Sequence, residues 1–151
     1  MPVLLVRHAS AGERAAWVGD DRLRPLDERG WRQAYGLVAQ LAPFAVRRVL
    51  SSPYLRCVQT VEPLARARGL EVEETPALAE GHEDEGVAMA LELAGTDTVL
   101  CTHGDLVPPI LAAFLPGDAH AQSEKGSTWV LGTPTASGSD REGHHHLSPP
   151  A

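Results

Sequence analysis

The stretch VLLVRHAS, residues 3–10, joins four apolar residues directly to an arginine and a histidine. The apolar run does not alternate, is too short for a helix and is β-branched at both ends, which is typical of a strand covered on both faces. Arg7 and His8 then fall at the carboxyl edge of that strand. A buried strand that ends in two cationic side chains raises the question of what these side chains bind.

Length and composition indicate one ordinary globular domain over residues 1–151, because the chain is long enough for one core and too short for two. No run approaches the roughly 20 apolar residues of a membrane helix, and the first residues lack the features of a signal peptide. Only two cysteines are present, Cys57 and Cys101. We therefore expect a soluble, cytoplasmic protein that does not associate with a membrane.

The formal net charge of −7 argues against a nucleic-acid partner, because such binding needs a basic face. An anionic ligand must therefore be bound locally. Of 13 basic residues only Lys125 is a lysine, and guanidinium groups suit bidentate contacts with phosphate or carboxylate. Genome composition explains the same bias equally well.

Apolar runs alternate with amphipathic segments along the chain. Strands are predicted at 3–6, 47–52, 70–78 and 97–103, helices at 31–42, 53–69, 86–95 and 105–115, and a closing antiparallel pair at 127–132 and 144–149. This alternation predicts an α/β fold, a three-layer sandwich whose mostly parallel sheet has helices on both faces.

Several residues are expected to begin, end or strain these helices. Ser52 is the expected N-cap of the second helix, with Pro53 at its first position and Gly69 past its end, and Pro63 should kink or split it.

The last predicted helix, over 105–115, carries similar markers. Asp105 is its expected cap, and Pro109 should strain it.

Parallel sheets bind ligands beyond the carboxyl ends of their strands. Arg7 and His8 follow the first predicted strand, residues 52–56 the second, Glu80 the third and His103 the fourth. Each side chain alone has an ordinary surface or packing explanation. Together they predict a site, because distant segments deliver them to one edge of the sheet.

The predicted group of side chains suits a doubly charged tetrahedral anion such as phosphate. Arg56 lies in the first turn of its helix and can lean toward the helix N-terminus, which itself attracts anions. A neutral imidazole can attack phosphorus and form a phosphohistidine. Cations then stabilise the equatorial oxygens, and a carboxylic acid protonates the leaving group.

Four motifs in order, LLVRHAS (4–10), LSSPYLRCVQT (50–60), LAEG (78–81) and LCTHGD (100–105), resemble the histidine phosphatase superfamily, which has the phosphoglycerate mutase-like fold. The resemblance spans residues 2 to about 132.

Two branches of that family are similar in detail. The short chain and the segment RPLDERG (24–30) resemble the SixA-type phosphohistidine phosphatases. The segments SSPYLRCVQTVEPLA (51–65), CTHGD (101–105) and KGSTWVL (125–131) are similar to the phosphatase domain of bacterial MutT-like Nudix fusion proteins.

The resemblance implies a role for each residue that matches its motifs. His8 would be the phosphorylated nucleophile, Arg7 and Arg56 would clamp the phosphoryl oxygens, and His103 would donate a further hydrogen bond. Glu80 would be the proton donor and then the base for water. The resemblance implies no cofactor and no metal.

Two departures from the family pattern bear on these roles. Ala9 stands where many members have glycine, a change common in the SixA-like group. SixA-type members can lack the acid at the position of Glu80, and Glu83 and Glu85 remain alternative proton donors.

The loop over 9–30 is longer than connectors usually are without a function. Arg24 and Trp17 are candidates for covering the substrate, together with the acidic pair Asp20 and Asp21. An equally good interpretation is that Trp17 anchors the loop onto the body of the protein.

Lys125 is a further candidate at the edge of the pocket, although Gly126 beside it is more simply a turn residue. The run His144 to His146 invites a metal interpretation. Consecutive strand residues face opposite sides, so we do not expect a metal site there.

Three other function classes are alternatives to the phosphatase. A cysteine-dependent phosphatase needs an arginine six residues after its thiolate, but Pro63 and Val107 stand there, so both cysteines are expected to be buried packing residues. No HExxH or paired-cysteine spacing supports a metal-dependent hydrolase. The third class is a phosphoanion-binding module without turnover, which the intact His8 argues against.

The substrate stays open at this point. A phosphorylated small molecule, a nucleotide and a phosphohistidine protein all present the same phosphoryl group, and specificity lies in the loops. One alternative is a nucleotide phosphatase that acts alongside a Nudix hydrolase supplied by a separate chain.

Overall fold

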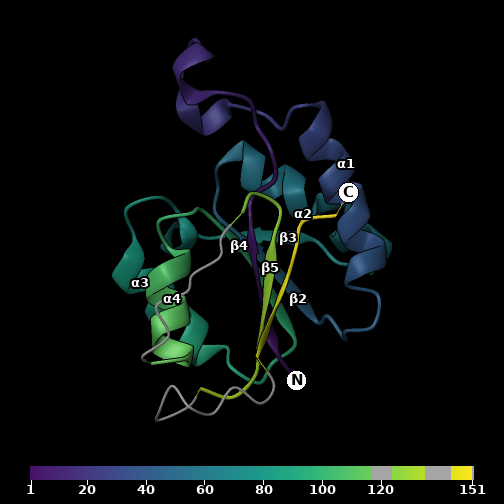
Figure 1. The fold of residues 1–151 in the computed structure, drawn as a ribbon, viewed down its shortest axis with the longest axis vertical. Helices are drawn as coiled ribbons and strands as arrows, with labels where there is room; N and C mark the ends of the chain where they lie inside the picture. The colour runs from purple at the N-terminus through teal and green to yellow at the C-terminus, as the bar shows by residue number, and fades with distance from the viewer. Residues whose placement is uncertain (117–123, 135–143, 151) are drawn as a thin grey trace.

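Six strands form one sheet in the order β3-β2-β4-β1-β5-β6 in the computed structural model, which describes residues 1–116, 124–134 and 144–150 (Figure 1). The strands are β1 (Val3–Arg7), β2 (Arg48–Ser51), β3 (Val72–Glu74), β4 (Thr98–Thr102), β5 (Thr128–Leu131) and β6 (His145–Leu147). β3, β2, β4 and β1 run parallel, and β5 and β6 are antiparallel to their neighbours. The predicted mostly parallel sheet is confirmed.

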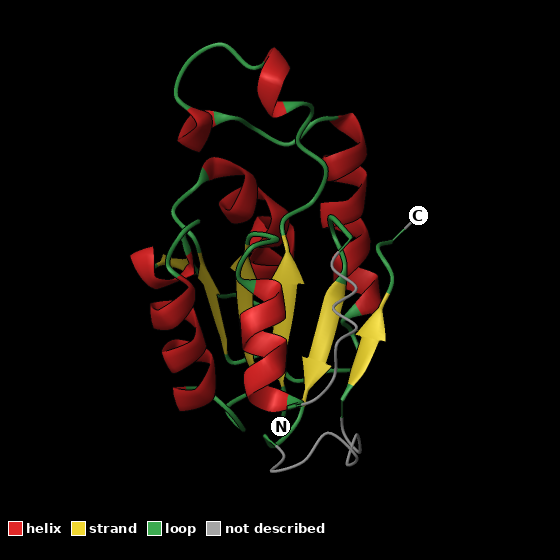
Figure 2. Cartoon of the chain, turned by 60° about the vertical axis from the view of Figure 1, so that its left-hand side comes forward, coloured by secondary structure: helices red, strands yellow, loops and turns green. Residues whose placement is uncertain are grey.

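Helices cover both faces of this sheet, as Figures 1 and 2 show. They are α1 (Glu28–Gln40), α2 (Leu55–Ala67), α3 (Glu83–Glu92) and α4 (Val107–Phe114), with short 3-10 turns η1 (Arg14–Ala16), η2 (Asp21–Leu23) and η3 (Pro76–Leu78). α1 and α2 pack together on one face, and α3 and α4 on the other. The predicted three-layer α/β sandwich is confirmed.

The first strand is apolar throughout because it supplies both cores. Val3 and Leu5 pack beneath α3 and α4, whereas Leu4 and Val6 pack beneath α1 and α2. All four side chains are at most 1% exposed. A strand in the middle of a sheet covered on both faces has no reason to alternate.

The start of α2 differs from the prediction. The helix begins at Leu55 with Tyr54 as N-cap, so Ser52 does not cap it. The Ser52 hydroxyl accepts a hydrogen bond from the Tyr54 N–H at 3.2 Å and faces the predicted site. Pro63 lies inside the helix without splitting it, and Gly69 stands past the helix end with a φ of 68°, as expected.

The start of α4 differs as well. Leu106 is its N-cap, and the Asp105 carboxylate instead accepts a hydrogen bond from the Gly81 N–H at 2.9 Å. Pro109 lies in the first turn, where backbone N–H groups have no partner within the helix, so it costs the helix no hydrogen bond. The expected strain at Pro109 is therefore absent.

Other boundaries shift by a few residues. β3 is shorter than the expected strand over 70–78, because η3 forms its second half. α3 begins at Glu83, earlier than expected, and three acids occupy its first turn, where the helix dipole favours negative charge. β5 and β6 form the predicted antiparallel pair, and residues 135–143 of the turn-rich segment between them lie outside the described residues.

None of the helices in the described ranges is both long and apolar enough to cross a membrane.

Gly30 in the first turn of α1 touches the backbone of the loop that follows β1. A Cβ at this position would lie 1.9 Å from the carbonyl oxygen of Ser10. Gly30→Ala should therefore lower the free energy of unfolding by about 1–3 kcal/mol, although glycine to alanine within a helix ordinarily stabilises. Urea denaturation measures the change, with the exposed Arg29→Ala as control. A stability equal to the parent protein would contradict the close approach.

Candidate active site

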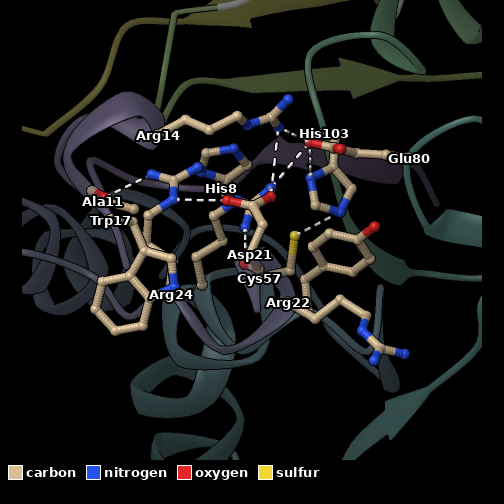
Figure 3. A network of polar contacts seen from close by, with 12 residues as sticks. His8, Ala11, Arg14, Trp17, Asp21, Arg22, Arg24, Cys57, Glu80 and His103 are labelled. Carbon is tan, nitrogen blue, oxygen red and sulfur yellow. Dashed lines mark hydrogen bonds and ion pairs between the residues drawn. The ribbon is translucent and has the colours of Figure 1, made fainter. Parts of the chain in front are cut away.

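The pairing of β1 with β4 brings the two predicted histidines together. Arg7 lies opposite Thr102 in the parallel ladder, and the His8 N–H donates to the Thr102 carbonyl at 3.0 Å. His8 and His103 therefore follow neighbouring strands, and their ring centroids are 5.4 Å apart (Figure 3).

The geometry of His8 defines its tautomer. Its Nδ1 lies 2.8 Å from the Ala9 carbonyl oxygen, which can only accept, so Nδ1 carries the proton and Nε2 keeps its lone pair. Burial lowers the pKa of His8 to about 3, and electrostatic interactions with the neighbouring His103, Arg56 and Arg7 act in the same direction. The imidazole is therefore neutral near pH 7.

His103 is held by residues around the start of α2. Its Nε2 lies 2.9 Å from the Ser52 hydroxyl and 3.5 Å from the Cys57 sulfur, and the Tyr54 ring packs edge-on at 4.6 Å. Its buried Nδ1 has no hydrogen-bond partner in the described part of the chain and lies 3.5 Å from a Glu80 oxygen. The Ser52 hydroxyl thus holds Nε2, whereas Nδ1 stays available to hydrogen-bond a ligand.

The side chain of Arg7 packs against the backbone that follows His103. A Cβ at Gly104 would lie 2.9 Å from the Arg7 Cζ, so a larger residue there would displace the guanidinium from this position. Partial burial lowers the pKa of Arg7, while the charge of Asp105 opposes that shift. Gly104 belongs to the CTHGD motif, but its contact with Arg7 depends on the β1–β4 pairing.

The guanidinium of Arg56 is completely buried, in the first turn of α2. Its Nη1 donates to the Asp21 carbonyl at 2.8 Å, and its Nη2 donates to the carboxylates of Asp21 at 3.1 Å and Glu80 at 2.9 Å. The group also lies 4.9 Å from the Tyr54 ring centroid. Arg56 is therefore close to the site, but two carboxylates cover it.

Asp21 connects the long loop over residues 9–30 to Arg56 through hydrogen bonds. Burial alone would raise its pKa, but the Arg24 hydrogen bond at 2.9 Å and the charges of Arg56 and Arg14 outweigh burial and lower it. The sequence marked Asp21 only as one of two loop acids. Its contact with Arg56 joins residues 35 positions apart, and no local pattern signals such a contact.

Of the three candidate acids, Glu80 is the one that lies beside Arg56 and lines the cavity. One of its oxygens accepts from Arg14 and from Arg56. Glu83 and Glu85 lie in the first turn of α3 and do not line the central cavity.

A cavity of about 540 Å³ opens above these groups. Among its lining residues are Arg7, His8, Arg14, Glu80, His103 and Lys125. Arg56 is absent from this lining because Asp21 and Glu80 cover it. The cavity combines a neutral imidazole with several positive side chains, an arrangement suited to a phosphoryl group.

The three loop candidates have different positions. Arg24 also lines the cavity and donates to the Ala11 carbonyl at 2.6 Å. Lys125 is placed by Gly126, whose N–H donates to the carbonyls of residues 7 and 8 and whose φ of 83° makes the expected turn. Trp17 does not line this cavity of about 540 Å³. Its indole N–H donates a hydrogen bond to the backbone carbonyl of Asp20 in the same loop.

The three consecutive histidines have three different surroundings. His144 bonds to backbone groups just after β5, while His145 and His146 pack on Phe44 and Trp129 respectively. The described residues contain no group of three or more side chains placed to hold a metal.

The fold and the arginine–histidine cavity define a phosphate-handling α/β enzyme. Residues 3–90 match the sequence profile of the histidine phosphatase superfamily (branch 1). The chain belongs to this superfamily, and the match supports a phosphatase.

Individual relatives and structures agree with the family. The chain is similar to a Mycolicibacterium smegmatis protein named 8-oxo-(d)GTP phosphatase, at 38% identity over 98% of this chain and 48% of that protein. It thus spans about half the length of this curated relative.

The fold resembles the tungstate complex of the protein histidine phosphatase SixA, with a TM-score of 0.77 and 23% identity over 100% of this chain and 97% of the other. The fold also resembles that of a putative phosphohistidine phosphatase SixA from Agrobacterium tumefaciens. The TM-score is 0.77, and the sequence identity is 22% over 98% of this chain and 97% of the other.

An anion that binds at Arg56 would compete with the Asp21 carboxylate, so we expect Asp21→Asn to strengthen inhibition by inorganic phosphate or tungstate. Two charges at about 4 Å retain about 1 kcal/mol in water, which corresponds to about a fivefold lower inhibition constant. The matched control is Asp20→Asn, whose carboxylate pairs with the exposed Arg22. Equal inhibition constants for both variants and the parent would show that Asp21 does not compete.

Proposed function

We propose that the chain hydrolyses phosphorylated substrates through a covalent phosphohistidine on His8. The observation that carries this proposal is the buried, neutral imidazole whose Nδ1 is bound to the Ala9 carbonyl, which leaves the Nε2 lone pair for phosphorus. A nucleophile must be unprotonated, and this environment keeps it so without a separate base.

In the proposed first step, Nε2 of His8 forms a bond to phosphorus while the bond to the leaving oxygen breaks and that oxygen takes a proton. In the second step, water attacks phosphorus, releases phosphate and restores the imidazole. Arg7, Arg56 and His103 would stabilise the charge on the equatorial oxygens in both steps. Since these side chains supply positive charge, we propose that the reaction needs no metal.

The contacts of Glu80 support its role as proton donor and later base. Without substrate its carboxylate pairs with Arg14 and Arg56. A phosphate dianion would take over these guanidinium partners and repel a second negative charge beside it. Substrate binding would thus release the Glu80 carboxyl group from its guanidinium partners, next to the leaving group.

A nucleotide is the substrate class that the comparisons favour. The 8-oxo-(d)GTP phosphatase is 38% identical to this chain, whereas the SixA structures reach 22–23%. A phosphohistidine protein is the second candidate, supported by the close fold similarity to SixA.

We further propose that residues 1–151 form a single histidine phosphatase domain and that it works in the cytoplasm. The buried, unpaired Cys57 and Cys101 support a reducing compartment.

Turnover with an activated aryl phosphate should place a phosphate on His8. Rapid quenching at neutral or basic pH, followed by mass spectrometry, should find this label, stable to base and labile to acid. His8→Ala should abolish both label and turnover, and added chelator should leave the parent activity unchanged. Label on another residue, or parent-like turnover by His8→Ala, would refute the mechanism. Phosphate binding without turnover would indicate a binding module.

The effect of Glu80→Gln should depend on whether the leaving group of the substrate needs a proton. An alkoxide needs a proton as its bond to phosphorus breaks, whereas a nitrophenolate leaves without one. The variant should lose about 10²–10⁴-fold in kcat/KM on alkyl phosphates and far less on an aryl phosphate or a phosphoramidate. Glu83→Gln is the matched control. An equal loss on all three substrates would make Glu80 a positioning residue instead of an acid.

A further inference from the structure

We propose that the base of a nucleoside monophosphate substrate stacks on Trp17, in a second cavity beside the phosphoryl site. This inference rests on the phosphatase function proposed above. The second cavity has a volume of about 280 Å³ and shares Gly12, Glu13 and Arg24 with the larger one. A substrate whose phosphoryl group lies at His8 can therefore extend its leaving group into it.

The two cavities differ in chemistry. The phosphoryl cavity is lined mainly by charged and polar side chains, whereas Ala16, Pro25 and Leu26 give the second one apolar walls. Among the described residues that line either cavity, Trp17 is the only tryptophan, tyrosine or phenylalanine, and it is 38% exposed. A planar aromatic group can stack on such an indole.

The Trp17 indole is positioned before any ligand arrives. Its N–H donates to the Asp20 carbonyl at 3.0 Å. Arg24, in the shared wall, donates to the Ala11 carbonyl and to the Asp21 carboxylate, contacts drawn as dashed lines in Figure 3. A ring already held in place loses little conformational entropy when a base stacks on it.

The charge at the junction favours a neutral leaving group. Glu13 and Arg24 line both cavities, and because the Arg24 guanidinium is already paired with the Asp21 carboxylate, the Glu13 carboxylate would repel a further phosphate there. A nucleoside is uncharged and aromatic, so it fits this junction better than a second phosphate or a small sugar does. A phosphohistidine would instead place a peptide chain at this position.

A second aromatic surface provides the control. Trp31 and Tyr35 line an apolar groove of about 430 Å³ between α1 and α2, which shares no lining residue with the phosphoryl cavity. Tyr35 is 63% exposed, so Tyr35→Ala removes an aromatic ring without opening the core.

The kinetic test compares guanosine 5′-monophosphate with glycerol 3-phosphate, because both release a primary alkoxide. Trp17→Ala should raise KM for the nucleotide about tenfold, or about 1.4 kcal/mol, because the base loses its stacking on an aromatic side chain. KM for glycerol 3-phosphate, and kcat for both, should stay near the parent values. Trp17→Phe should retain part of the nucleotide preference, because it keeps one aromatic ring for stacking and loses the five-membered ring with its N–H. Tyr35→Ala should leave KM and kcat near the parent values for both substrates.

A binding test separates failure of the subsite from failure of the proposed catalysis. In His8→Ala, which cannot turn over by the proposed route, guanosine 5′-monophosphate should quench tryptophan fluorescence and glycerol 3-phosphate should not. The quenching should disappear in the double variant His8→Ala/Trp17→Phe. Quenching that persists there, or a Trp17→Ala effect equal on both substrates, overturns the proposal. Quenching at Trp17 without turnover by the parent protein would support the subsite and refute the phosphatase.

Discussion

The parallel pairing of β1 with β4 in the middle of the sheet is the constraint on which the site depends. Neighbouring strands lie about 4.8 Å apart, so residues that follow them in register must be neighbours. The hydrogen bond from the His8 N–H to the Thr102 carbonyl extends this register past the end of β1. It places His103 beside His8, and Gly104 then lets the Arg7 guanidinium approach the same point. A shift in this pairing would separate all of these groups.

The second constraint is the complete burial of a guanidinium group. A buried charge is costly unless it is paired and hydrogen-bonded, and both Nη groups of Arg56 are paired, with Asp21 from the long loop and Glu80 from the segment after β3. Its buried Nε has no hydrogen-bond partner among the described residues. The contacts of the Nη groups also hold the loop over the sheet edge. The loop is therefore part of the site, and an anion that binds Arg56 must rearrange contacts that also position the loop.

His8 and His103 lie side by side but differ in which ring nitrogen the protein holds by a hydrogen bond. His8 donates a hydrogen bond from its Nδ1–H to a backbone carbonyl and is kept neutral by burial and nearby positive charge. His103 is held through Nε2 by the Ser52 hydroxyl, with Nδ1 directed toward Glu80. One ring thus presents a lone pair, and the other presents its remaining nitrogen at the edge of the same cavity. This division suits the nucleophile and the charge-stabilising group that we propose.

The sequence by itself determined the α/β class, the strand ends that bear Arg7, His8 and His103, and the family, because these follow from local apolar runs and short contiguous motifs. Helix starts at Ser52 and Asp105 were mispredicted, because both side chains serve tertiary partners instead of caps. Only the tertiary structure decided that Asp21 covers Arg56 and that Trp17 lies beside the phosphoryl cavity. Such contacts depend on how a loop folds back over the sheet, which residue spacing does not encode.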